Sequence, residues 1–181
     1  KNPSSFKGDN LPIEMVSWDA AMGFCQKLTK FERATGRIPD GWVYTLPTET
    51  QWEYACRAGT SSAYSFGDSI TSKQANIEST VGKTTFVGKY SDNAWGFHDM
   101  HGNVNEICAD GYLNALRGGL DPWEQRIKEG DVVIRGGAWS STSEYCQAGF
   151  RNSAGHKDKS GEFANVGLRV ILSSMELNEK Q

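Results

Sequence analysis

Apolar residues recur at spacings of three and four between positions 18 and 34 and predict an amphipathic helix there. Ser17 stands just before this run as an N-cap, and Gly36 follows it as a stop signal. The apolar stripe of this helix is expected to comprise Ala21, Phe24, Cys25, Leu28 and Phe31.

A second helix is predicted after Leu46-Pro47. Thr48 and Gln51 have the spacing of a capping box, in which each side chain satisfies a backbone donor near the other. Gly59 is expected to end this helix. Its buried face would be formed by Trp52, Ala55 and Cys56.

Short apolar or alternating runs predict strands. They lie at residues 11–16, 42–44, 133–135 and 166–170. About fifty residues beyond Gly59 show no regular period. The pattern therefore predicts an irregular, loop-rich α+β fold with two main helices and short antiparallel strands.

A long polar run separates the last two predicted strands and is the candidate recognition surface. Gly136 and Gly137 precede it and allow positive φ or a close backbone approach. Long loops in compact domains usually carry function, and the alternative is a plain connection between two strands. The candidate ligand-binding residues are Trp139, Ser140, Ser141, Thr142, Ser143, Glu144, Tyr145, Phe150, Arg151, Asn152, Ser153 and His156.

Composition narrows the class of protein and the compartment. The 181 residues suit one domain, and a net charge of −3 without a basic stripe argues against nucleic acid as a partner. No run of 18 apolar residues is present, so no membrane span is expected. The four cysteines lack C-x-x-C spacing, which argues against a zinc site. Two disulfides are possible in an oxidising compartment, but a domain of this size does not need them, so free buried thiols are favoured. With no visible signal peptide, the cytoplasm is the favoured location.

Six ordered motifs together resemble the formylglycine-generating-enzyme (sulfatase-modifying factor) family over residues 2–171. The resemblance implies a fold related to C-type lectins and a single domain over residues 1–181, with a polar tail at 173–181. The family's N-terminal strand-rich portion is expected to be missing. The motifs lie at residues 12–20, 46–55, 93–96, 102–106, 135–139 and 167–169.

The resemblance also implies a copper site, which this sequence departs from. Oxidases of the family hold Cu(I) with two cysteines, the second of which falls on Cys146 and the first on Ser141. The serine that follows their Arg-Gly-Gly motif falls on Ala138. A hydroxyl does not replace a thiolate at a soft ion, so copper is not expected. A copper-dependent oxidase acting on protein cysteine, with Cys146 as its residual catalytic candidate, is the alternative function.

A calcium loop is a further implication of the resemblance. Its ligands would be backbone carbonyls around His101, Gly102 and Val104 together with the Glu106 side chain. The competing interpretation is a glycine turn followed by a capping or salt-bridged Glu106. The family's second calcium loop would fall near Asn76-Ile77, where the expected downstream Asp is lacking.

The function expected from these departures is noncatalytic binding of a protein or small-molecule ligand by the polar run. Two branches of the family suggest it: the variable proteins of diversity-generating retroelements, which would be surface-exposed, and sensor domains joined to kinases. Arg135 and Arg169 are expected to hold loop carbonyls as part of the frame. The side chains of His98 and His101 are interpreted as ordinary turn residues rather than ligands of a zinc or iron ion.

Overall fold

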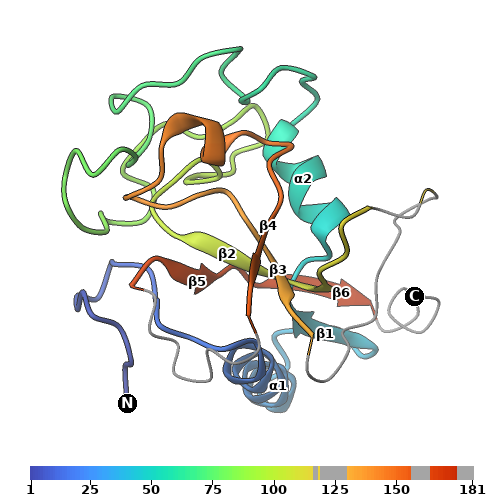
Figure 1. The fold of residues 1–181 in the computed structure, drawn as a ribbon. Helices are drawn as coiled ribbons and strands as arrows, with labels where there is room; N and C mark the ends of the chain where they lie inside the picture. Colours follow the sequence, from blue (N-terminus) through green and yellow to red (C-terminus); the bar gives the residue numbers. More distant parts are fainter. Residues whose placement is uncertain (116–117, 119–129, 156–163, 175–181) are drawn as a thin grey trace.

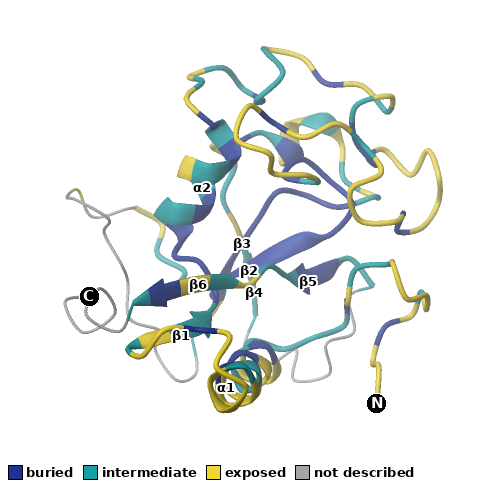
Figure 2. Cartoon of the chain, turned by 180° about the vertical axis from the view of Figure 1, so that it is seen from behind, coloured by how far each residue is buried: buried dark blue, intermediate teal, exposed yellow. Residues whose placement is uncertain are grey.

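The computed structural model describes residues 1–115, 118, 130–155 and 164–174 (Figure 1). Figures 1 and 2 show a long irregular segment, residues 59–104, at one end of the molecule and helix α1 at the other. Short strands lie between them. The structure confirms the α+β class, with two helices and short strands. No helix in the described ranges is both long and apolar enough to cross a membrane.

Helix α1 (Trp18–Ala34) has the predicted bounds, and the side chain of Ser17 accepts from the amide of Ala20 as its N-cap. The predicted stripe is partly wrong, because Phe24 and Phe31 are 51% and 60% exposed. The buried positions are Ala21, Cys25 and Thr29, each four residues from the last. These small side chains let the helix lie close to strand β1 (Trp42–Thr45), where Thr29 Oγ1 accepts from the amide of Tyr44 at 2.8 Å.

Helix α2 (Glu49–Arg57) has both halves of the predicted capping box between Thr48 and Gln51. Trp52 and Cys56 are buried as predicted. The helix ends one residue earlier than expected, because Ala58 rather than Gly59 is the left-handed cap, with φ of 46°.

A four-stranded sheet of order β4-β3-β2-β5 forms the centre of the fold. Strands β2 (Asn105–Gly111), β3 (Val132–Arg135) and β4 (Asn152–Ala154) pair antiparallel. Strand β5 (Val166–Leu168) pairs parallel to β2, which differs from the all-antiparallel expectation. A separate antiparallel pair joins β1 to β6 (Ile171–Ser174).

The strand predicted at residues 11–16 is wrong. This segment makes only one isolated bridge, between Glu14 and Gly167. Met15 has φ of 59°, outside the extended region, and this turn of the backbone ends any ladder after a single pair. A Cβ at Gly167 would collide with the Ile13 carbonyl, so the two chains approach closely only because position 167 is glycine.

Candidate functional site

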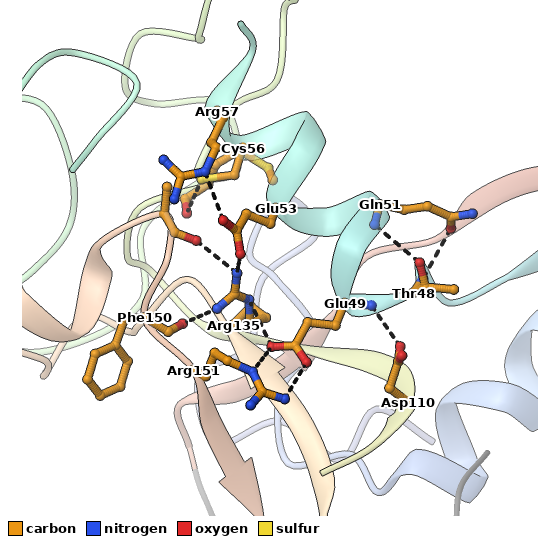
Figure 3. A network of polar contacts seen from close by, with 12 residues as sticks. Thr48, Glu49, Gln51, Glu53, Cys56, Arg57, Asp110, Arg135, Phe150 and Arg151 are labelled. Atoms are coloured by element: carbon orange, nitrogen blue, oxygen red, sulfur yellow. Dashed lines mark hydrogen bonds and ion pairs between the residues drawn. The ribbon is translucent and has the colours of Figure 1, made fainter. Parts of the chain in front are cut away.

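A ladder of alternating charges connects α2 to β3 and to Arg151, the residue before β4 (Figure 3). Glu49 and Glu53 are four residues apart on α2 and therefore share one face of the helix. The buried Arg135 of β3 reaches both: its Nη2 donates to Glu53, and its Nε lies 3.6 Å from Glu49 Oε1. Arg151 donates to both oxygens of Glu49 at 2.7 Å, and Arg57 donates to Glu53 at 2.8 Å. Each carboxylate in the ladder thus meets two guanidinium groups.

Arg135 also holds the backbone of the loop that follows it. Its two terminal nitrogens donate to the carbonyl oxygens of Phe150 and Ala148. Arg169 donates to the carbonyl of His98 at 2.9 Å while pairing with Glu106. Both arginines therefore act as the frame residues that the sequence predicted.

The start of the loop is fixed by backbone contacts with turns from the irregular segment. The Trp139 amide donates to the Asn103 carbonyl at 2.9 Å, and the Ser79 amide donates to the Trp139 carbonyl at 2.7 Å. Gly137 has φ of 69°, and a Cβ there would collide with the sulfur of Cys146. The glycine pair is thus required for both the turn and the close packing.

The recognition loop, defined as residues 139–150, presents polar and aromatic groups outward. Tyr145 is 50% exposed and packs edge-on against the ring of Phe150, with centroids 4.8 Å apart. Thr142 Oγ1 donates to Glu144 at 2.6 Å, so two exposed side chains fix each other. Residues 143–146 form a single 3₁₀ turn, η1 (Ser143–Cys146). The exposed members of the loop are Ser140, Thr142, Glu144, Tyr145 and Gly149.

Several predicted ligand-binding residues instead serve the frame. Ser141 accepts from the amide of Ala138 at 3.0 Å, and Trp139 is half-buried, donating from Nε1 to the Ala164 carbonyl. Arg151 belongs to the ladder. Asn152 and Ser153 lie on the edge strand β4, beyond the loop. Ser143 and Phe150 are half-buried within the loop, and His156 lies outside the described residues.

Cys146, the residual catalytic candidate, is completely buried. Burial raises the pKa of its thiol to about 12, and nearby Glu78 adds to the increase. All four cysteines are free and buried, as the sequence predicted. Since the thiolate is the form that binds copper or attacks a substrate, this environment disfavours both.

The buried His101 lies between Cys56 of α2 and Cys146 of η1. Its Nδ1 lies 2.8 Å from the carbonyl oxygen of Cys146, and its Nε2 accepts from the amide of Ser65 at 3.1 Å. Burial lowers the pKa of His101, which keeps the imidazole neutral. Within the described ranges, no cluster of three or more His, Cys, Asp or Glu side chains could hold a metal ion.

The turn predicted to bind calcium places Glu106 in a different role. Arg169 donates to both of its oxygens, at 2.6 and 2.7 Å, and Trp52 Nε1 donates to Oε2 at 2.6 Å. The charge of Glu106 is therefore neutralised by Arg169, and both of its oxygens accept hydrogen bonds within the protein. This arrangement does not fit a calcium ligand. It favours the salt-bridged interpretation of Glu106 beside the turn at His101, Gly102 and Val104.

The sequence analysis missed the roles of Glu49 and Glu53. The available signal was two glutamates at helical spacing beside the arginine of an Arg-Gly-Gly motif. Asp110 caps the start of α2, because its carboxylate accepts from the Glu49 amide at 2.7 Å.

The sequence is similar to regions of two kinds of known protein. Serine/threonine-protein kinase pkn1 of Chlamydia caviae is 32% identical over 157 residues, which is 80% of this chain and 22% of the kinase. The formylglycine-generating enzyme of Mus musculus is 25% identical, over 92% of this chain and 45% of that enzyme. The chain thus spans about a fifth of the kinase and under half of the enzyme.

Two solved structures have similar folds. Treponema denticola variable protein 1 superposes with a TM-score of 0.80 at 26% identity, over 96% of this chain and 78% of that one. PvdO from Pseudomonas aeruginosa superposes with a TM-score of 0.76 at 27% identity, over 93% of this chain and 64% of that one. The sequence model of the sulfatase-modifying factor enzyme 1-like domain matches residues 1–174, and the chain belongs to this family.

Proposed function

We propose that this chain is a noncatalytic recognition domain that binds a protein or small-molecule ligand through its recognition loop. The observation that carries the proposal is the contrast between the two sides of residues 139–150. Their inner side is held by Arg135 and by backbone contacts with the irregular segment. Their outer side presents Tyr145 on Phe150, with short polar side chains around it.

This contrast suits binding because the loop is ordered before a ligand arrives. Tyrosine supplies a large contact area and a hydroxyl with only two rotatable side-chain bonds. A backbone that is already fixed loses little further entropy on association. The exposed Tyr145 is therefore the residue expected to contribute most to affinity.

The chemistry of the loop supports recognition over oxidation. In this family's oxidases two thiolates hold the copper. The first of these positions is Ser141 here, and its hydroxyl oxygen accepts a hydrogen bond from the amide of Ala138. The single thiol nearby, Cys146, is buried with a raised pKa.

The relatives support the same proposal. Similar chains include a variable protein and a region of a serine/threonine kinase. We infer that this domain acts either as a retroelement-diversified binder or as the sensing unit of a larger signalling protein.

The test compares two exposed aromatic residues. Peptide and glycan arrays would be probed with the wild-type chain, with Tyr145→Ala, and with Phe24→Ala as a matched control on α1. We expect saturable binding that falls at least about tenfold in Tyr145→Ala and is unchanged in Phe24→Ala. Equal binding by both variants would contradict the assignment of the loop.

A parallel assay addresses oxidation directly. The reduced protein would be given Cu(I), oxygen and a cysteine-containing sulfatase peptide, and the peptide would be analysed for an aldehyde. We expect no aldehyde. Its formation, lost in Cys146→Ala, would establish the oxidase instead.

A further inference from the structure

A groove of about 490 Å³ lies between the turn at residues 96–99 and the C-terminal end of β5, and no residue of the recognition loop lines it. This volume is within the range of sites that hold small organic ligands. Several of its apolar lining residues, including Val87, Phe97 and Val170, are exposed. The apolar walls are formed by Pro12, Val87, Phe97, Val104, Leu168 and Val170.

Two of the charged residues in the groove neutralise each other. Arg169 donates Nε and Nη2 to the two oxygens of Glu106, and Trp52 supplies a further donor to the same carboxylate. Arg169 also donates from Nη2 to the carbonyl of His98 at 2.9 Å. An incoming anion would therefore have to displace Glu106 before it could use this guanidinium.

Asp99 is the charge that is left over. Its Oδ2 accepts from the Gly88 amide at 2.7 Å, whereas no described residue donates to Oδ1. Burial raises the pKa of Asp99, against the lowering effects of the Gly88 bond and of Arg169. Its backbone has φ of 59°, a region that Asp and Asn adopt more readily than other non-glycine residues. The fold thus holds a partly desolvated carboxylate with an open acceptor.

His98 adds a second acceptor beside it. Its Nδ1 lies 2.8 Å from the carbonyl oxygen of Tyr90, and a carbonyl can only accept. The ring proton therefore sits on Nδ1, which makes Nε2 an acceptor in the neutral imidazole. The ring of Phe97 lines the same groove, and an aromatic face attracts cations.

We propose that this groove is a second binding site and that it takes an alkylammonium group on a short hydrocarbon stem. The ammonium group donates to Asp99 Oδ1 and to His98 Nε2. The stem lies against the apolar walls formed by Val87, Leu168 and Val170. A carboxylate ligand would meet the charge of Asp99 and find Arg169 occupied, and a neutral ligand would bring no charged donor to Asp99 Oδ1.

The first experiment uses a pair of probes that differ only in charge. n-Butylammonium and neutral N-butylacetamide would be titrated into the ¹⁵N-labelled chain at neutral pH. We expect saturable shifts of the amides of Gly88, His98 and Asp99 with the amine, and binding at least about tenfold weaker with the amide. Equal binding of the two probes, or no saturable binding of the amine, would overturn the proposal.

The second experiment removes the charge without changing the shape. Asp99→Asn keeps the side-chain volume, tolerates positive φ and retains an acceptor for Gly88. We expect it to weaken n-butylammonium binding about tenfold or more. Asp40→Asn, which removes an exposed carboxylate at the turn before β1, should bind as the wild type does. Unchanged affinity in Asp99→Asn would also overturn the proposal.

The stability of Asp99→Asn shows whether a loss of binding reflects a loss of fold. A raised folded-state pKa means that ionised Asp99 costs stability as the pH rises through that pKa. Asp99→Asn should therefore melt at the wild-type temperature or higher at neutral pH. A lower melting temperature would count against the desolvated carboxylate on which the site depends.

Further titrations ask which natural amine the groove binds and whether the groove acts independently of the recognition loop. Spermidine represents a free polyamine, and a lysine-containing peptide with its Nε-acetylated form represents a protein side chain. The tighter of the two amine ligands identifies the source. Tyr145→Ala should bind n-butylammonium normally, so failure at one site is distinguishable from failure at the other.

Discussion

Replacing Arg135 by Met tests whether the charge ladder holds the recognition loop in place. The substitution keeps an unbranched apolar stem but removes the guanidinium group and its contacts to Glu53, Ala148 and Phe150. Both carboxylates of the ladder keep another arginine, so neither becomes an isolated charge. The main loss is then two charge-assisted bonds to carbonyls, together with the buried ion pair. We expect a destabilisation of about 3 to 5 kcal/mol.

Urea unfolding followed by tryptophan fluorescence would measure this loss. Hydrogen exchange would report on the loop, where the amides of residues 140–150 should lose protection more than those of α1. Arg37→Met is the matched control, because Arg37 makes an exposed pair with Glu32 and its removal should barely move the midpoint. A loss below about 1 kcal/mol in Arg135→Met, with unchanged exchange in the loop, would refute the structural role of the ladder.

Three further outcomes follow from local geometry. Thr48→Ala removes half of the capping box of α2 and should cost about 1 kcal/mol in the same unfolding assay. Iodoacetamide should modify Cys146 only under denaturing conditions, because burial raises its pKa to about 12 and keeps the thiol protonated at neutral pH; rapid alkylation of the folded chain, detected by mass spectrometry, would contradict this. Calcium and EGTA should give the same melting temperature, because Arg169 and Trp52 already occupy Glu106; a rise with calcium that Glu106→Gln abolishes would establish the predicted calcium site.

The two helices were predictable because their signals are local. Ser17 and the Thr48–Gln51 pair identify each start within four residues of chain. The direction that a helix faces is less local. Phe24 and Phe31 fit the apolar period of α1, but the face that meets β1 is the one that carries Thr29. Only the position of the neighbouring strand decides between these two faces.

The candidate site was predicted in its exposed half and missed in its buried half. Short polar residues after Trp139 indicate a surface without reference to any partner. Arg151 shows the same polar character, yet it pairs with Glu49, 102 residues earlier in the chain. Pairings over such distances leave no periodic pattern in the sequence. They become visible only when the fold brings β3 and Arg151 beside α2.

A side chain can bind a ligand only if some of its hydrogen-bonding atoms or its surface are not already engaged within the protein. Glu49, Glu53 and Glu106 each meet two or more donors, so their charge is already used in holding the frame together. A group with all of its bonds made inside the protein has little left for a ligand. Asp99, with one oxygen open, and the outward ring of Tyr145 are different in this respect. We therefore expect a ligand on this frame to contact Asp99 or Tyr145 and not the carboxylates of the ladder.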